Sequence, residues 1–221
     1  MIVQIYEVRS PAEAVALAAC GVDHIGVLVG FGAFPREIDP VSARLIFDAC
    51  PAAVTRVALS LSAAPEAIGA VIAETRPDIL HLGAAAELFS AGATAMLKER
   101  HPSCRIMRSI PVIDASSLAL AREYEGIADF LLLDSHRPGD VQIGAQGRTH
   151  DWEISRRIVE TVAVPAILAG GLGPDNVAEA IRAVHPAGVD SKTRTDRADG
   201  TGKDLRAVAR FLAAARNVED R

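Results

Sequence analysis

Two neighbouring segments of the chain end in residues whose types and spacing could do chemistry. A hydrophobic run ends on Asp134, and the glycine-rich stretch after it leads to Asp151, which we expect to cap a helix. A second apolar run ends in Gly170-Gly171, directly before another helical segment. A carboxyl group can exchange protons with a substrate, and glycines at a helix N-terminus let backbone N–H groups bind an anion. The two segments therefore predict acid/base chemistry beside an anion site.

The elements that must position these residues repeat one pattern along the chain. Short runs rich in Val, Ile and Leu predict strands, and helical stretches lie between them. We expect strands at Ile2–Val8, His24–Val29, Thr55–Leu61, Asp78–Gly83, Arg105–Val112, Asp129–Ser135, Pro165–Gly170 and Gly188–Thr193. Several of the helical stretches open with a proline or an aspartate: Pro11, Pro65, Pro174 and Asp204.

Eight such β/α units, with no linker dividing them, predict an α/β fold of one specific kind. We expect a (β/α)8 TIM barrel that forms a single domain over residues 1–221. A doubly wound open sheet is the alternative, but no GxGxxG motif follows the first strand. In a barrel, the carboxyl ends of all strands meet at one face, and enzymes of this fold build their active sites there.

The composition excludes several classes of function. Of the 221 residues, 50% are hydrophobic but only 4% are aromatic, which suits helices packed on a parallel sheet. The net charge of −5 and the lack of a basic block argue against a nucleic-acid partner. No run is long enough for a membrane span and no secretion signal is evident, so we expect a cytoplasmic protein. Cys20, Cys50 and Cys104 lie far apart and are expected to be plain thiols.

Four patches of the sequence resemble the phosphoribosylanthranilate isomerase family of tryptophan biosynthesis, and the resemblance runs nearly end to end. The patches are LLLDS with GAQGRTHDW, PAILAGGLGPDNVAEAI, HPAGVDSKTRTDRADGTGKD and GVLVGFGAFPREIDP. The resemblance implies an isomerase that performs an Amadori rearrangement, in which the ring of a phosphorylated aminoaldose opens and an aminoketose forms. It also implies a small phosphorylated substrate, a monomer or homodimer, and no metal or redox cofactor.

The resemblance also assigns roles to residues of this chain. Asp134 matches the general acid, although it could instead cap a helix or pair with a loop. Gly170 and Gly171 match the phosphate loop, although glycines also end strands for structural reasons. Arg36 matches the arginine that holds the aromatic carboxylate, or it is a solvated loop residue. Asp190 matches the acid that contacts the sugar hydroxyls, with a structural aspartate as the alternative.

One departure from the family concerns the general base. The family's first strand ends in Lys-Ile-Cys-Gly, whose cysteine is the base, and here Gln4, Ile5, Tyr6 and Glu7 stand in its place. A phenol with a pKa near 10 is a poor base at neutral pH unless a cation lowers that pKa. Strand alternation predicts that Glu7 points away from the face that Tyr6 uses. His81 is expected to face into the barrel, either as a base or as a buried structural histidine.

Further departures add positive charge. Lys192, Thr193 and Arg194 lie at the end of the eighth strand, where the family has small residues that wrap the phosphate. Their side chains could grip a phosphate, or the two cations could be solvated. Arg108 replaces a frequent lysine and is expected to add positive charge inside the mouth of the barrel. The six histidines show no HxH or HxxxH spacing, so we expect no metal site.

Three interpretations of the function follow from these residues. The chain could be an isomerase or lyase of the same scaffold that acts on another phosphorylated sugar derivative. It could also perform the parent reaction with Tyr6, Glu7 or His81 as a substitute base. The alternative of a different class is a catalytically silent barrel that binds a phosphorylated metabolite.

Overall fold

The computed structural model describes residues 1–135 and 149–218, over which strands and helices alternate. The strands are β1 (Ile2–Ile5), β2 (His24–Leu28), β3 (Thr55–Ser60), β4 (Ile79–Leu82), β5 (Arg105–Val112), β6 (Phe130–Ser135), β7 (Ala166–Leu168) and β8 (Gly188–Ser191). The helices are α1 (Pro11–Cys20), α2 (Pro40–Asp48), α3 (Pro65–Thr75), α4 (Ala91–Arg100), α5 (Ser116–Glu123), α6 (Trp152–Thr161), α7 (Val177–Val184) and α8 (Leu205–Arg216).

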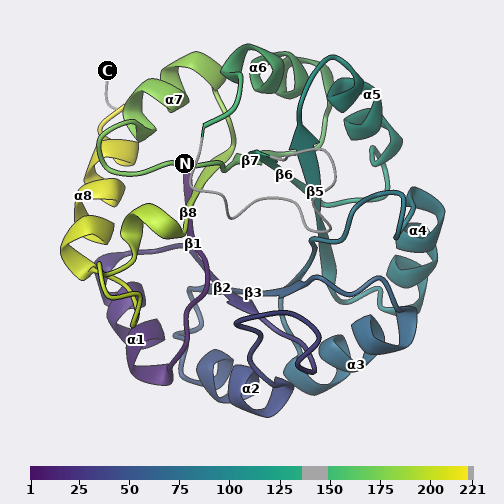
Figure 1. The fold of residues 1–221 in the computed structure, drawn as a ribbon, viewed down its shortest axis with the longest axis horizontal. Helices are drawn as coiled ribbons and strands as arrows, with labels where there is room; N and C mark the ends of the chain where they lie inside the picture. The colour runs from purple at the N-terminus through teal and green to yellow at the C-terminus, as the bar shows by residue number, and fades with distance from the viewer. Residues whose placement is uncertain (136–148, 219–221) are drawn as a thin grey trace.

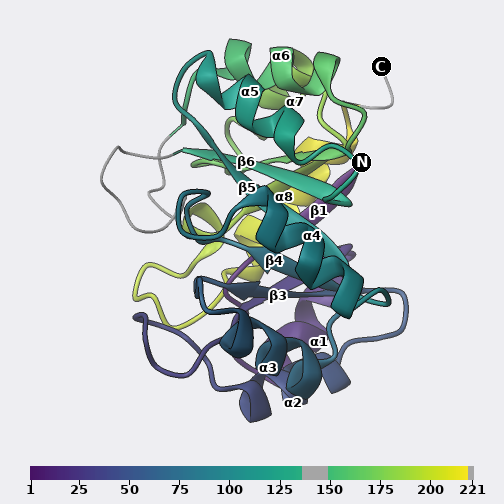
Figure 2. The same ribbon diagram turned by 90° about the vertical axis from the view of Figure 1, so that its right-hand side faces the viewer.

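The strands form a closed parallel barrel in the order β1 to β8, and the helices surround it as an outer ring (Figure 1). The barrel closes where β1 pairs with β8, and Gln4 lies opposite both Asp190 of β8 and His24 of β2. Seen from the side, the strands cross the middle of the molecule between layers of helices (Figure 2). The predicted (β/α)8 TIM barrel is confirmed, and the open sheet is excluded.

Local sequence explains where the helices begin. Pro11 occupies the first turn of α1, and the Ser10 side chain accepts a hydrogen bond from the Glu13 backbone N–H. Asp204 caps α8 by accepting hydrogen bonds from two backbone N–H groups, and Asp151 caps α6 as the sequence predicts. No helix within the described ranges is long and apolar enough to span a membrane.

The core has two apolar layers. The larger layer lies between the strands and the helices and consists mostly of Val, Ile, Leu and Ala. The smaller layer fills the inside of the barrel, because strand alternation directs every second side chain inward. Its buried members are Tyr6, Val57, Ile79, Met107, Phe130, Leu132, Ile167 and Ala169.

Three strands end at least two residues before the ends that their sequence runs predict. β1 ends at Ile5 rather than Val8, because the backbone at Glu7 turns into the left-handed region with a φ of 60°. β7 covers only Ala166–Leu168. β8 ends at Ser191, and a short 3₁₀ turn (η1, Thr193–Thr195) follows it. All three early endings lie on the same face of the barrel, where they release the backbone into the loops that line the mouth.

Candidate active site

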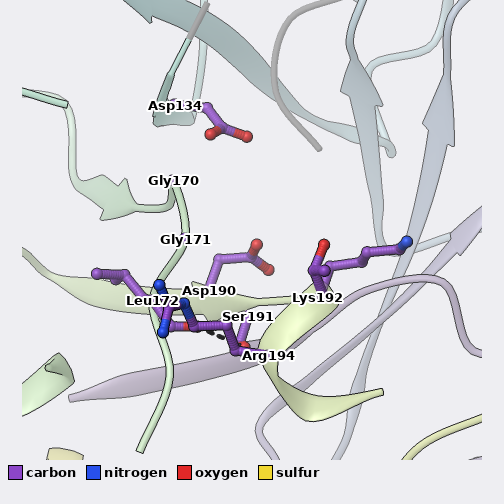
Figure 3. Close-up of a pocket in the computed structure, with 9 residues that line it drawn as sticks. Asp134, Gly170, Gly171, Leu172, Asp190, Ser191, Lys192 and Arg194 are labelled. Atoms are coloured by element: carbon purple, nitrogen blue, oxygen red, sulfur yellow. Dashed lines mark hydrogen bonds between the residues drawn. The ribbon is translucent and has the colours of Figure 1, made fainter. Parts of the chain in front are cut away.

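The carboxyl ends of the strands enclose two adjoining pockets. The first lies beside the glycine loop and is lined by Asp134, Gly170, Gly171, Leu172, Asp190, Ser191, Lys192, Thr193 and Arg194 (Figure 3). The second lies towards β1 and is lined by Tyr6, Glu7, Leu59, His81, Leu132, Asp134, Asp190 and Lys192. Because three residues belong to both pockets, the two form one continuous site.

The glycine loop is shaped by its own backbone and by one asparagine. Gly170 and Gly171 have φ angles of 82° and 63°, a backbone conformation that is unfavourable for residues with a side chain. Asn176 precedes α7, where it accepts a hydrogen bond from Gly173 N–H (2.8 Å) and donates one to Gly171 O (3.2 Å). Ser191 Oγ donates to Leu172 O (2.8 Å), which ties the loop to β8. The loop is therefore held open in front of the N-terminus of α7, a position that favours an anion.

Two cations line the glycine-loop pocket, but their side chains diverge (Figure 3). Arg194 extends towards the glycine loop and packs so closely over Gly173 that a Cβ there would lie 2.7 Å from its Cδ. Lys192 extends the other way, and its Nζ lies 3.5 Å from Glu7 Oε2 and 3.4 Å from Asp196 Oδ2. Arg194 is thus placed for an anion on the loop, whereas Lys192 is engaged on the β1 side.

Two carboxyl groups face the site from β6 and β8. Asp134 accepts hydrogen bonds from the Ser135 backbone N–H (2.7 Å) and hydroxyl (3.3 Å), and Asp190 accepts one from Gln4 Nε2 (3.2 Å). Burial, together with the neighbouring charge of Asp134, raises the pKa of Asp190 to about 8. The raised pKa favours a proton on Asp190 at neutral pH, beside Asp134, and a general acid must carry a proton.

Tyr6 fills the barrel below the second pocket. Its hydroxyl lies 2.5 Å from Nδ1 of His81, whose Nε2 lies 2.7 Å from Ser109 Oγ. Burial and the charge of Asp190 raise the pKa of Tyr6 well above its usual value of 10.0. Burial and the charge of Arg108 lower the pKa of His81 to about 3. Tyr6 therefore stays a phenol that donates to a neutral imidazole.

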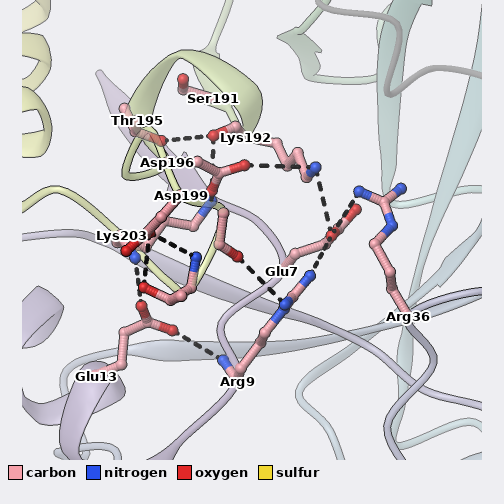
Figure 4. A network of polar contacts seen from close by, with 12 residues as sticks. Glu7, Arg9, Glu13, Arg36, Ser191, Lys192, Thr195, Asp196, Asp199 and Lys203 are labelled. Atoms are coloured by element: carbon pink, nitrogen blue, oxygen red, sulfur yellow. Dashed lines mark hydrogen bonds and ion pairs between the residues drawn. The ribbon is translucent and has the colours of Figure 1, made fainter.

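Glu7 stands at the centre of an ion-pair network with Arg9, Arg36 and Lys192 (Figure 4). Its Oε2 lies 3.1 Å from Arg36 Nη1, 3.5 Å from Lys192 Nζ and 3.8 Å from Arg9 Nη2. The side chain is only 9% exposed. The prediction that Glu7 points away from the face used by Tyr6 is wrong, because its positive φ breaks the strand alternation and turns the carboxylate into the same pocket.

Comparisons with known proteins decide the family. The family model described as "N-(5'phosphoribosyl)anthranilate (PRA) isomerase" matches residues 34–214. Relatives from Methanocella arvoryzae and Haloferax volcanii, both named N-(5'-phosphoribosyl)anthranilate isomerase, are each 36% identical to this chain. The alignments cover 97% of this chain and 97% of the first relative, and 98% and 93% for the second. The chain belongs to the PRA isomerase family.

A solved structure agrees at the level of the fold. A PRA isomerase in complex with reduced 1-(o-carboxyphenylamino)-1-deoxyribulose 5-phosphate matches with a TM-score of 0.77 and 24% identity. The match covers 98% of this chain and 100% of that chain. The predicted family and the predicted kind of protein, a PRA isomerase-like enzyme, are therefore confirmed, and a silent barrel is not favoured.

The site of this PRA isomerase relative brings together most of the residues that the sequence suggested. Asp134, Asp190 and the cations after β8 line one pocket with the two glycines, and Tyr6 and His81 line the adjoining one. The surroundings of Tyr6 and His81 do not favour either as the substitute base, because burial raises the pKa of the phenol and lowers that of the imidazole.

The structure places Arg36 at the site but Arg108 away from it. Arg36, with a φ of 70°, points to Glu7 from the loop after β2 and is 37% exposed at its side chain, so it stands at the rim of the site. The prediction that Arg108 adds positive charge inside the mouth is wrong. Arg108 is fully buried, donates to Leu82 O (3.0 Å) and stacks on Tyr124 at the end of α5. Its outward direction follows from strand alternation, because its neighbour Met107 faces the barrel interior.

Some functional features lie beyond the sequence reasoning. The glycine-rich loop at 144–148 falls outside the described residues. Gln4, which joins Asp190 to His24, and Asn176, which braces the glycine loop, were not predicted as site residues. The stretch GLGPDN did carry a signal for Asn176, because an asparagine before a helix commonly caps it. No cluster of three His, Cys, Asp or Glu residues suited to a metal ion occurs within residues 1–135 and 149–218.

Proposed function

We propose that this chain catalyses an Amadori rearrangement of a phosphorylated aminoaldose, with N-(5'-phosphoribosyl)anthranilate as the parent substrate. The observation that carries the proposal is one pocket in which Asp134 and Asp190 face a glycine loop and the guanidinium of Arg194. The relatives' names support the choice of substrate, because both are named for this isomerisation.

The phosphate is proposed to bind at the glycine loop. The backbone of Gly170 and Gly171, the N-terminus of α7, Thr193 and the guanidinium of Arg194 surround this pocket. Anchoring the phosphate there places the sugar ring over Asp134 and Asp190, which line the same pocket and the adjoining one. Positioning of this kind supplies much of the rate enhancement of an isomerase.

The carboxyl pair is proposed to start the reaction. Asp134 gives a proton to the ring oxygen as the bond from that oxygen to C1 breaks, which leaves an iminium between C1 and the nitrogen. A base then removes the proton from C2, which gives an enolamine with a double bond between C1 and C2. Protonation of C1 and loss of the proton from the hydroxyl on C2 then yield the ketone. Asp190, whose raised pKa favours its protonated form at neutral pH, is proposed to resupply Asp134 with a proton.

A second candidate is a different 5-phosphoribosylamine derivative. One contact favours it: the guanidinium of Arg36, which the family resemblance assigns to the aromatic carboxylate, is already 3.1 Å from the carboxylate of Glu7. A substrate without that carboxylate would leave this ion pair undisturbed.

Turnover of the parent substrate tests the proposal. N-(5'-phosphoribosyl)anthranilate made in situ is mixed with the purified chain, and the loss of anthranilate fluorescence is followed. We expect turnover by the wild type and a decrease in kcat of about 10²- to 10⁴-fold in Asp134→Asn. A thermal unfolding curve controls for the folding of the variant. Absence of turnover at high enzyme concentration would contradict the parent reaction and direct the search to other 5-phosphoribosylamines.

A further inference from the structure

We propose that Glu7 is the general base that removes the proton from C2 in this isomerisation. The inference rests on the proposed function and adds the one chemical group that the reaction still lacks. The family's cysteine position is occupied by Tyr6, so the base has moved one residue along the chain.

The backbone places Glu7 where a base is needed. The residues on either side are held by hydrogen bonds to both neighbouring strands, from Tyr6 N to Ser191 O and from Val8 N to Gly26 O (3.1 Å each). Between these fixed points Glu7 has a φ of 60°, a conformation that costs a non-glycine residue roughly 1 kcal/mol or more. This turn brings the carboxylate into the pocket that Asp134 and Asp190 also line.

The cations around Glu7 fix the carboxylate by one oxygen. The closest contacts of Arg36, Lys192 and Arg9 are all made to Oε2 (Figure 4). We assign Oε1, which makes none of these closest contacts, as the oxygen that accepts the proton from the substrate. Lys192 is fixed in turn by Asp196, whose other oxygen lies 2.6 Å from the buried Lys203. The network orients Glu7 in the way that a rigid supporting shell orients a catalytic group.

The other groups in the pocket are unsuited to the task. Tyr6 keeps its proton, and both ring nitrogens of His81 are engaged by Tyr6 and Ser109. Asp134, beside Asp190, whose raised pKa favours its protonated form, serves as the acid. The acid and the base are both carboxyl groups, but their surroundings differ. The acid lies beside another carboxyl group at the ends of β6 and β8, whereas the base lies among cations beyond the end of β1.

The rival role for Glu7 is that of a counter-ion that only neutralises Arg36 and Lys192. Glu7→Gln separates the two roles, because it keeps the size of the side chain and removes its basicity. Three quantities are measured for each variant: kcat with N-(5'-phosphoribosyl)anthranilate, the kinetic isotope effect with substrate deuterated at C2, and the Kd of reduced 1-(o-carboxyphenylamino)-1-deoxyribulose 5-phosphate. Glu66→Gln, an exposed change on α3, is the matched control.

We expect Glu7→Gln to lower kcat by about 100-fold or more, to raise the isotope effect, and to change the Kd of the reduced analogue less than threefold. Glu7→Asp should retain part of the activity, and Glu66→Gln should retain all of it. A kcat within threefold of the wild type, or a loss of analogue binding that matches the loss of kcat with no change in isotope effect, would overturn the assignment of Glu7 alone. A wild type without turnover would instead overturn the proposed function and the base with it.

Discussion

At the scale of single residues, the surroundings of each carboxyl group decide its chemistry. Asp190 is buried beside Asp134, and both effects disfavour its negative charge. Glu7 lies instead among three cations, with a nitrogen atom of each within 4 Å of its Oε2. The same functional group can therefore serve as acid on one side of the pocket and as base on the other.

The raised pKa of Asp190 makes a prediction about stability. Between pH 4 and pH 8 the folded chain keeps a proton on Asp190 that the unfolded chain has lost, so this contribution to stability is complete below about pH 4 and is lost as the pH rises towards 8. Asp190→Asn removes the titration. We expect the free energy of unfolding of the variant, relative to the wild type, to increase over this window by on the order of a few kcal/mol. Urea unfolding at pH 5 and pH 8 measures it, and equal differences at both pH values would contradict it.

Arg36 makes a second prediction at this scale. If its guanidinium binds the aromatic carboxylate of the substrate, Arg36→Met should raise KM about tenfold or more and change kcat much less, because the contact exists in both ground and transition states. Arg44→Met on α2, where Arg44 pairs with Asp48, is the matched control. An unchanged KM in Arg36→Met would mean that Arg36 forms an ion pair with Glu7 but does not bind the substrate.

At the scale of secondary-structure elements, the packing between β2 and the residue that follows β1 depends on one glycine. A Cβ on Gly26 of β2 would lie 2.2 Å from the Tyr6 ring just beyond β1, so an alanine cannot fit while the ring remains. The ring in turn spans the barrel to His81 of β4. Tyr6 thus joins three strands, and it has a packing role that a cysteine could not perform.

This fit predicts a strong coupling between two substitutions. Gly26→Ala should destabilise the wild type by about 1–3 kcal/mol through overpacking. The same change in a Tyr6→Ala background should lower the free energy of unfolding much less, because the Tyr6 ring that would clash with the new methyl group is absent. A double-mutant cycle by chemical denaturation measures the coupling energy. Equal costs in both backgrounds would show that the backbone of β2, rather than the Tyr6 ring, requires glycine.

At the scale of the whole molecule, two buried histidines (His24 and His81) and the half-buried His150 set the response to acid. Burial is the main cause that lowers the pKa of His24 to about 4, of His81 to about 3 and of His150 to about 4. Between pH 4 and pH 6.5 the unfolded chain binds protons that the folded chain rejects, so stability rises with pH through this window. These contributions are complete above pH 6.5 and are lost as the pH falls.

We therefore expect the chain to lose stability from pH 7 to pH 4.5, because three histidines outweigh the opposite trend of Asp190. Urea unfolding across this range provides the measurement. His81→Gln, which removes one of the three groups, should reduce the histidine contribution to this loss by about a third. A flat or rising profile towards acid pH would contradict the buried, neutral state of these histidines.

The large-scale architecture could be predicted from the sequence because its signals recur along the chain. Eight apolar runs, each with polar or glycine residues at its end, define a barrel and the face that carries its site. The direction of single side chains could not be predicted so well. The positive φ of Glu7 turns its side chain to the opposite face from the one that strand alternation predicts. Alternation also cannot say which of two neighbouring residues faces inward, and for this reason the predicted direction of the Arg108 side chain was wrong. The divergence of Lys192 and Arg194 depends on Glu7 and Gly173, which are distant in sequence.

A crystal structure of the chain with reduced 1-(o-carboxyphenylamino)-1-deoxyribulose 5-phosphate would test the central claim most directly. The claim is that one site holds a phosphate at the glycine loop, an acid at Asp134 and a base at Glu7. We predict that the phosphate contacts the backbone of Gly171 and the guanidinium of Arg194, and that the C2 atom lies within about 3.5 Å of Glu7. A phosphate bound on the β1 side, at Lys192 and Arg36, with Glu7 displaced from the pocket, would contradict the account.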